Sequence, residues 1–364
     1  MRPSSEDDLA EIIRTAAAPL RVCGGGTRPV ARAPAGEGLS VAGLTGIVLY
    51  EPQTLTLVVR AGTPLAEVEG TLAAEGQRLP FEPPDWRGLL GVDGESTIGG
   101  VVAANASGPR RVQAGAARDS VIGVRFVDGT GLVVKSGGRT MKNVTGYDLV
   151  KLMAGSRGTL GVLTEVSLKL LPAAGAVATL VVAADDPGAA VSVMQSALSS
   201  PHDVTGAAWL PGTGVLVRVE GLAASVAYRS EKLALRLDAI GVERDPGRNV
   251  TLWQDVASVR PLQGRSGDLW RFSLRPSEAP RVAARLGADV VLDWGGGLLW
   301  TVLPAGKDAR ALARPYAGHA TLMRADRPTP HAVFEPEPPA VAALTRGLRA
   351  RFDPRAILNR GLMD

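Results

Sequence analysis

Three glycine-rich segments in the first half of the chain constrain its fold more than any other feature. They read CGGGTRP (23–29), STIGGVVAANASGPRR (96–111) and GSRGTLGV (155–162). Glycine tolerates positive φ angles and lets consecutive backbone N–H groups converge on one anion. One such segment is typical of a tight turn. Three of them, two opening directly into apolar stretches, favour a site for a nucleotide-like ligand with a pyrophosphate.

The chain lacks the motifs that serve other nucleotides or hydrolytic chemistry. No G-x-x-x-x-G-K-[ST] run is present, which argues against a Walker-type ATP site. The G-x-G-x-x-G dinucleotide fingerprint fails because Gly24 and Gly26 are followed by Pro29 where a small residue is needed. The G-x-S-x-G elbow and the H-E-x-x-H zinc helix are absent as well. Any chemistry therefore has to come from a bound cofactor.

Length, charge and cysteine content narrow the class of protein. A chain of 364 residues exceeds the usual size of a single core, so we expect two domains. Forty basic and 36 acidic residues give a net charge of +4, and the arginines are scattered, which argues against a nucleic-acid partner. One cysteine, Cys23, excludes a disulfide framework and any cysteine-rich iron–sulfur or zinc site made by this chain alone. Such a centre would have to lie on a partner.

The N-terminus and the hydropathy pattern indicate a cytoplasmic protein. Residues 1–13 (MRPSSEDDLAEII) carry carboxylates where a signal peptide needs an apolar run. No later stretch approaches the roughly 20 apolar residues of a membrane-spanning helix.

Hydrophobic periodicity predicts two differently built parts. Before Pro172 we expect a capped helix from Ser5, strands at 20–23, 54–60 and 160–171, a helix after Thr63 (N-cap) and Pro64, and a hairpin at 121–135. After Pro172, strands at 177–183, 204–210 and 214–220 alternate with helices at 188–199 and 222–239, which suggests a ferredoxin-like unit. A second batch from 268 to 323 follows a similar order, and a proline-rich connector (327–339) leads to a final helix.

Five longer segments carry a family resemblance: LPFEPPDW (79–86), TIGGVVAANASGPRR (97–111), RDSVIGVRFVDGTG (118–131), GGRTMKNVTGYDLVKLMAGSRGTLGVLTEVSLKLLP (137–172) and FDPRAILNRG (352–361). They resemble the FAD-binding (E) subunits of bacterial three-part glycolate oxidases, in the PCMH (vanillyl-alcohol-oxidase-like) flavoprotein superfamily. The resemblance implies an α+β fold with a two-subdomain PCMH-type FAD-binding domain (1–172). A shortened ferredoxin-like cap domain (173–336) and a C-terminal helix and segment returning to the flavin (337–364) would follow.

The resemblance also implies which residues bind FAD. The first loop would face the FAD diphosphate, the second segment would pass along the ribityl and isoalloxazine, and the third would lie near adenine and ribose. Asn359 would approach the flavin from the far end of the chain, although the family usually reads Asn-Pro-Gly where this chain has Arg360 in the middle. The complete expected set is Gly24, Gly25, Gly26, Thr27, Thr97, Gly99, Gly100, Ala104, Asn105, Ser107, Gly108, Arg118, Asp119, Gly158, Gly161, Val162 and Asn359.

Other conspicuous residues have plainer interpretations. Lys142, Asn143 and Tyr147 could bind a carboxylate or relay a proton beside a flavin, or simply cap and pack a helix. The histidines 202, 319 and 331 are far apart, which favours loop or surface roles over metal ligation. Tryptophans 253, 270, 294 and 300 are interpreted as core and interface anchors of the second domain. Cys23 is interpreted as a small buried packing residue, with covalent flavin attachment as the minor alternative.

Two functional hypotheses stay open at this point, and a third is weaker. The resemblance implies an FAD-dependent oxidoreductase subunit that oxidises a 2-hydroxy acid, glycolate to glyoxylate, beside a catalytic flavoprotein subunit and an iron–sulfur subunit, reaching the inner membrane only through those partners. Related 2-hydroxyacid dehydrogenases resemble one another in a histidine-bearing metal motif, which this chain lacks. A non-catalytic electron-relay or assembly subunit is therefore the alternative. The third hypothesis is a stand-alone oxidoreductase.

Overall fold

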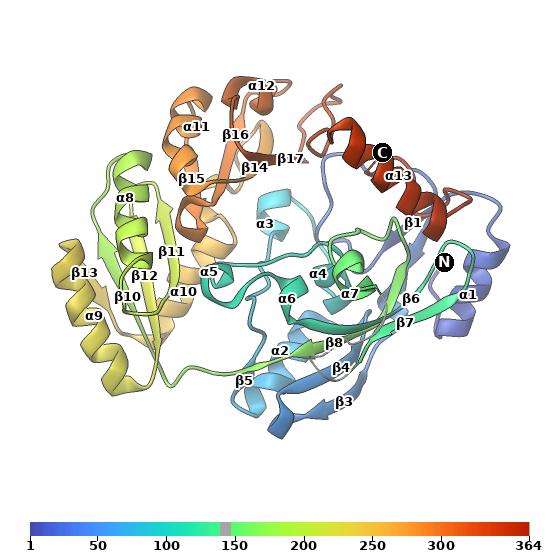
Figure 1. Cartoon of the computed structure of the whole chain (residues 1–364), viewed down its shortest axis with the longest axis horizontal. Coiled ribbons are helices and arrows are strands. Elements are labelled where there is room, and N and C mark those ends of the chain that lie inside the picture. The colour runs from blue at the N-terminus through green and yellow to red at the C-terminus, as the bar shows by residue number, and fades with distance from the viewer. Residues whose placement is uncertain (139–146, 364) are drawn as a thin grey trace.

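The computed structural model describes residues 1–138 and 147–363, and its first part is built on a five-stranded antiparallel sheet at the lower right of Figure 1. In sheet order the strands are β3 (Ile47–Glu51), β4 (Thr56–Arg60), β8 (Val162–Lys169), β6 (Val121–Val127) and β7 (Val133–Gly137). The hairpin predicted at 121–135 is β6–β7, and the long strand predicted before Pro172 is β8. Two small pairs stand apart: β1 (Leu20–Cys23) with β2 (Glu37–Ser40), and β5 (Gln77–Arg78) with β9 (Leu171–Pro172).

Local sequence signals explain the two longer helices of this part, with one correction. Helix α1 (Glu6–Thr15) begins as predicted, because the Ser5 side chain accepts a hydrogen bond from the Asp8 amide. Helix α2 (Leu65–Ala74) has Pro64 at its N-cap position, with no capping side-chain hydrogen bond, so the prediction of Thr63 as the N-cap was wrong. The Thr63 hydroxyl is used elsewhere, since it accepts from the Gly46 amide at 2.9 Å. The short helices are α3 (Arg87–Leu90), α4 (Ile98–Ala103), α5 (Arg111–Ala114), α6 (Ala117–Ser120) and α7 (Leu149–Met153).

The second part is one antiparallel sheet of eight strands, made from two strand-helix-strand-strand-helix-strand units (Figure 1, left and top). The first unit comprises β10 (Ala176–Val182), α8 (Pro187–Leu198), β11 (Val204–Leu210), β12 (Gly214–Gly221), α9 (Ala223–Leu237) and β13 (Gly241–Glu243). The second comprises β14 (Asp268–Leu274), α11 (Ala279–Leu286), β15 (Val290–Asp293), β16 (Leu298–Leu303), α12 (Ala309–Ala313) and β17 (Gly318–Arg324). The two batches seen in the sequence are thus two ferredoxin-like units.

The strand order explains how the units join. The order β13-β10-β12-β11-β15-β16-β14-β17 places the second strand of each unit at the centre, where Trp209 of β11 pairs with Leu292 of β15. Strands β11 and β15 would each be an exposed edge strand in an isolated unit. By pairing with each other they are protected from pairing with another chain. Helix α10 (Pro246–Ala257), which links the units, was missed in the sequence.

The two parts share one hydrophobic core. The largest cluster of buried side chains includes residues of the first sheet and residues of the eight-stranded sheet. Trp86 of the first part meets Trp300 of the second edge-on, with ring centroids 5.4 Å apart. The four tryptophans 253, 270, 294 and 300 are all buried, as predicted. The proposed division at residues 172 and 336 stays a prediction.

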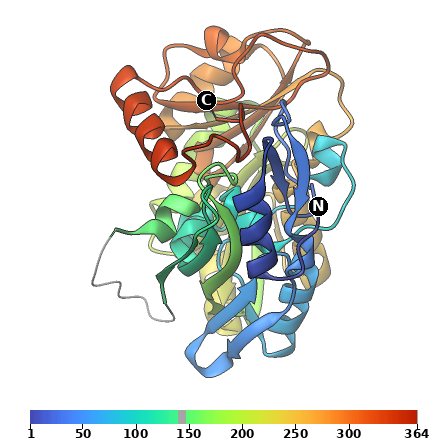
Figure 2. The ribbon, with the colours of Figure 1, turned by 90° about the vertical axis from the view of Figure 1, so that its right-hand side faces the viewer.

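The C-terminal segment returns to the first part. Helix α13 (Pro339–Phe352) lies on the outside of the molecule, as the red helix of Figure 2. After it, Leu20 of β1 donates its amide to Ile357 and bridges Leu358 in parallel. In the part of the chain that the structure describes, no helix is both long and apolar enough to cross a membrane.

Candidate functional site

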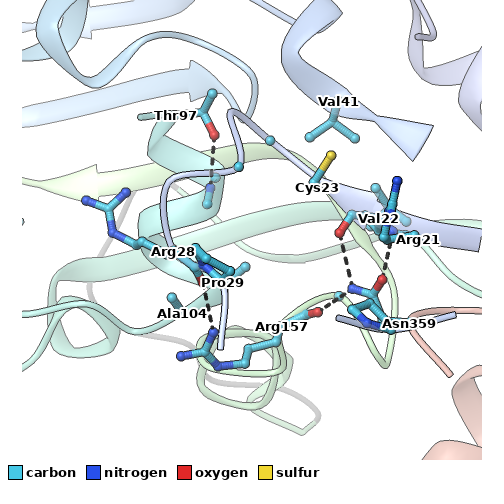
Figure 3. Close-up of a pocket in the computed structure, with 18 of the residues that line it drawn as sticks. Arg21, Val22, Cys23, Arg28, Pro29, Val41, Thr97, Ala104, Arg157 and Asn359 are labelled. Atoms are coloured by element: carbon cyan, nitrogen blue, oxygen red, sulfur yellow. Dashed lines mark hydrogen bonds between the residues drawn. The ribbon is translucent and has the colours of Figure 1, made fainter. Parts of the chain in front are cut away.

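A cavity of about 410 Å³ lies where the glycine segments meet the C-terminal strand-like tail (Figure 3). Twelve of the seventeen predicted cofactor residues line it, although they come from four distant stretches of the chain. They are Gly24, Gly25, Gly26, Thr27, Thr97, Gly99, Gly100, Ala104, Gly158, Gly161, Val162 and Asn359. A second cavity of about 490 Å³ shares residues 23–26 and Thr97.

The first loop presents unused backbone donors to both cavities. The amides of Gly24, Gly25, Gly26 and Thr27 donate no hydrogen bond to any described residue. Gly26 has φ +74, and a Cβ on Gly25 would lie 1.6 Å from the Glu95 carbonyl oxygen. A run of free amides at a cavity wall is a typical phosphate or pyrophosphate cradle.

The second segment forms the floor of the cavity as helix α4. Thr97 caps this helix by accepting a hydrogen bond from the Gly100 amide at 3.3 Å, shown dashed in Figure 3. A Cβ on Gly99 would lie 2.5 Å from the Ala61 Cβ, so this glycine lets the helix lie directly on the end of β4. Close packing against Ala61 is therefore enough to require a glycine at position 99, in addition to the place of Gly99 in the cavity wall.

Asn359 joins the two ends of the chain at the cavity. Its Oδ1 accepts from the Val22 amide at 2.7 Å, and its Nδ2 donates to the Val22 and Arg157 carbonyls at 3.3 and 2.7 Å. Figure 3 shows the three residues together on one side of the cavity. The replacement of proline by Arg360 leaves this arrangement intact, since Asn359 is buried and Arg360 points to solvent.

Five predicted residues do not line the cavity and instead shape the loop that follows α4. Asn105 accepts from the Arg118 amide at 3.0 Å, and Ser107 accepts from the Ala117 amide at 2.8 Å. The Gly108 carbonyl accepts from the Trp294 indole at 3.0 Å. Asp119 accepts from the Ala116 amide at 2.8 Å. The side chains of Asn105, Ser107 and Asp119 are thus occupied by the backbone of residues 105–119.

Arg157 is a cavity residue that sequence reasoning missed, although it lies inside the third glycine segment. Its Nη1 donates to the Arg28 carbonyl at 3.3 Å, and its guanidinium lies 5.6 Å from the centroid of the Phe334 ring. Burial lowers the pKa of Arg157 to about 10, so the side chain is a cation at neutral pH. Arg28 also lines the cavity, and its Nε is buried with no hydrogen-bond partner among the described residues. Both cations favour an anionic ligand.

The remaining sequence candidates lie elsewhere. Tyr147 is 90% exposed and does not line the cavity, whereas Lys142 and Asn143 lie outside the described residues. Cys23 is exposed at the cavity wall, so its interpretation as a buried packing residue was wrong. The reason is that β1 belongs to a two-stranded pair whose alternate positions face outward. Among residues 1–138 and 147–363, no three His, Cys, Asp or Glu side chains group as metal ligands.

The cavity fits an FAD on physical grounds. Free amides and half-buried arginines suit the diphosphate, while Gly24 and Gly25 let the loop lie directly against Thr97 and Glu95, where a Cβ would collide. The apolar residues Val22, Val41, Ala61 and Leu362 supply the surface that a flat ring system needs. The assignment of individual residues to parts of the cofactor stays a prediction.

Comparisons with known proteins point the same way. Residues 1–137 match the family model described as FAD binding domain. The chain is 35% identical over 360 residues to the glycolate oxidase subunit GlcE of Escherichia coli (strain K12), a match that covers 95% of this chain and 92% of that protein. It is 33% identical over 185 residues to the glycolate oxidase subunit GlcD of Bacillus subtilis (strain 168), covering 47% of this chain and 36% of GlcD.

Other matches are more distant. A D-lactate dehydrogenase of Archaeoglobus fulgidus is 30% identical over 178 residues, covering 47% of this chain and 38% of that enzyme. Alkyldihydroxyacetonephosphate synthase has the same fold, with a TM-score of 0.69 at 18% identity, covering 99% of this chain and 76% of that one.

Proposed function

We propose that this chain, which belongs to the glycolate oxidase GlcE family of FAD-dependent oxidoreductases, is the FAD-binding subunit of a complex that oxidises glycolate to glyoxylate. One observation carries the proposal. Segments from both ends of the chain converge on a cavity lined by four amides that donate to no described residue, and the match to GlcE covers 95% of the chain.

The residues of the chain have distinct tasks in this proposal. The amides of residues 24–27 bind the diphosphate, and Arg28 and Arg157 balance its charge. Asn359 holds the tail against β1, so the cavity is closed on the side of Val22. Bound FAD supplies hydride acceptance together with electron release in single steps. The chain's task in that chemistry is to orient the ligand, to exclude water and to hold negative charge.

The partners and the cellular place belong to the same proposal. With a single cysteine, this chain needs a partner that supplies iron–sulfur clusters to carry electrons onward. We further propose a second flavoprotein subunit, a cytoplasmic location, and contact with the inner membrane only through the assembled complex. Co-purification of a tagged chain, followed by mass spectrometry and membrane fractionation, tests these points.

The first experiment concerns the cofactor. We expect the purified chain to show a flavin absorption spectrum and to release one FAD per chain on denaturation. Absence of FAD after reconstitution would contradict the proposed site.

The second experiment separates the two functional hypotheses. Glycolate is added anaerobically to the chain alone and to the chain with its partner subunits. Bleaching of the flavin in the isolated chain supports a substrate site in this subunit. Bleaching of this subunit's flavin only in the complex supports the electron-relay alternative, and activity of a complex assembled without this chain would contradict both.

A further inference from the structure

Three arginines at the junction of the two parts make no ion pair with any carboxylate that the structure describes. Arg271 lies in the middle of β14, Arg111 begins α5, and Arg157 lines the cofactor cavity. None of the three forms an ion pair with a carboxylate in the described part of the chain. Within residues 1–138 and 147–363, the buried Arg271 Nε has no hydrogen-bond partner. An unsatisfied buried guanidinium is costly, and a bound anion removes that cost.

Trp294 holds two of these arginines together. The guanidinium carbons of Arg111 and Arg271 lie 4.4 and 5.2 Å from the centroid of its ring. The ring itself is fixed, because its Nε1 donates to the Gly108 carbonyl at 3.0 Å. Arg271 also lies 5.7 Å from the Trp300 ring, which packs against Trp86. The cations are therefore placed by a rigid aromatic support.

The positive charge of this cluster shifts the pKa values of neighbouring ionisable groups. Burial, together with the charges of Arg111 and Arg157, lowers the pKa of Arg271 to about 9. The pKa of His319 is lowered by partial desolvation and by the charges of Arg271 and Arg111, although its side chain is exposed at the start of β17. Two carboxyl groups face the cluster: Asp293, whose pKa is raised by burial to about 7, and Asp119 near Arg111. They leave the three guanidinium charges incompletely balanced.

We infer that Arg271 and Arg111, which share the Trp294 ring, form the binding site for the carboxylate of the substrate, whereas Arg157 lines the neighbouring cofactor cavity. A guanidinium binds a carboxylate through two parallel hydrogen bonds, which fixes its orientation as well as its charge. Arg271 comes from the eight-stranded sheet and Arg111 from the first part, so the site exists only where the two parts meet. The inference rests on the proposed function and adds the residues that select an acid over an alcohol.

The test measures binding of oxalate, a two-carbon acid with no oxidisable hydroxyl, to the FAD-loaded chain. Trp294 beside two arginines serves as the probe, so tryptophan fluorescence and flavin absorbance are followed during the titration, with Trp294→Phe identifying the fluorescence signal. The variants are Arg271→Gln, Arg271→Lys and Arg111→Gln. Arg248→Gln is the matched control, since Arg248 is 78% exposed on α10.

We expect the dissociation constant of oxalate to rise at least tenfold in Arg271→Gln and Arg111→Gln, as for loss of a charge-assisted hydrogen-bonded pair. Arg271→Lys should fall between Arg271→Gln and the unchanged chain, and Arg248→Gln should bind normally. Bound FAD per chain should be equal in all of them.

Three results would overturn the inference: no oxalate binding by the unchanged chain, unchanged affinity in both glutamine variants, or loss of FAD from Arg271→Gln. Loss of FAD would mean that the cluster holds the cofactor's phosphates. These results are distinguishable from failure of the proposed function, which would show as absence of FAD in the unchanged chain or as a glycolate-oxidising complex that works without it.

Discussion

At the scale of single residues, the site depends on backbone groups more than on side-chain chemistry. Asn359 shows this best, because its buried side-chain amide serves to hold backbone groups, the N–H and C=O of Val22 and the C=O of Arg157. Its backbone has φ +45, a conformation that asparagine adopts more readily than most residues. Asn359 thereby fixes both β1 and the loop that carries Arg157.

Asn359→Ala should therefore destabilise the protein and weaken FAD binding together. The change removes three hydrogen bonds and leaves buried groups unpaired, which we expect to lower the free energy of unfolding by about 2–4 kcal/mol. Urea unfolding and FAD retention on gel filtration measure the two effects. Arg360→Ala is the control, because Arg360 is exposed and should change neither quantity.

Gly25→Ala should abolish FAD binding. The new Cβ would lie 1.6 Å from the Glu95 carbonyl, so the loop has to move and its amides lose their alignment. Gly70→Ala is the matched control, because Gly70 lies in α2 with no atom within 4 Å of the added carbon. There the substitution should raise stability by about 0.5–1 kcal/mol. A yellow Gly25→Ala protein would contradict the role of the loop.

At the scale of elements, capping and strand pairing decide what holds the site in place. Helix α1 buries Leu9, Ala10 and Ile13 against the first part, and Glu6 at its start pairs with Arg125 of β6. The same cluster of buried side chains includes Leu20 of β1 and Leu358 of the tail. The N-terminal helix thus supports the strand that leads into the glycine loop.

Ser5→Ala should lower the free energy of unfolding by about 1 kcal/mol, because the Asp8 amide loses its capping partner. Ser5→Asp should keep most of the stability, since a carboxylate also caps a helix and interacts well with its N-terminal dipole. Urea unfolding measures both. Equal stability of Ser5→Ala and the unchanged protein would show that α1 is held by packing alone.

At the scale of the whole molecule, a buried ion network joins the two parts. Glu82 of the first part accepts hydrogen bonds from both terminal nitrogens of Arg218 on β12 at 2.8 Å. Arg110 pairs with Glu220 of the same strand, and Arg78 reaches Glu220 at 2.7 Å. Loss of one partner would leave the other charge buried and unpaired, which is costly. The network therefore strongly favours one relative placement of the parts.

Arg218→Met should destabilise the protein by about 3–5 kcal/mol, as expected when a buried pair loses one member. The double variant Arg218→Met with Glu82→Gln should recover part of this loss, because it removes the stranded carboxylate. Thermal and urea unfolding measure the cycle. Additive effects of the two single changes would contradict a direct coupling.

Acid should loosen the junction through Glu82. Burial raises the pKa of this carboxyl, but Arg218 and Arg110 outweigh burial and hold it below 4.5. A lowered pKa in the folded state means that the stabilisation is fully present above about pH 4.5 and is lost as pH falls through the folded value. Glu82→Gln should therefore show a smaller loss of unfolding free energy on acidification than the unchanged protein. An identical acid dependence would contradict this assignment.

The sequence alone predicted the features that depend on neighbouring residues. Glycine segments, the Ser5 cap, the β6–β7 hairpin and the two strand-helix batches all depend on signals within a few residues of each other, which periodicity and turn chemistry report directly. The missed helix α10 had such a signal too, since Asp245 and Pro246 form a standard helix start. The family resemblance added FAD, because a cofactor is recognised by a long pattern and not by any one loop.

Only the tertiary structure decided which residues meet. In the folded chain, the side chains of Asn105, Ser107 and Asp119 accept hydrogen bonds from backbone amides. Pro64, and not Thr63, is the N-cap residue of α2, and the ferredoxin-like units join through β11 and β15. It also brought Arg111, Arg271 and Trp294 together from positions far apart in the chain. The physical reason is that long-range pairing and burial depend on the packing of all elements at once, whereas turns, caps and glycine loops depend on local backbone energies.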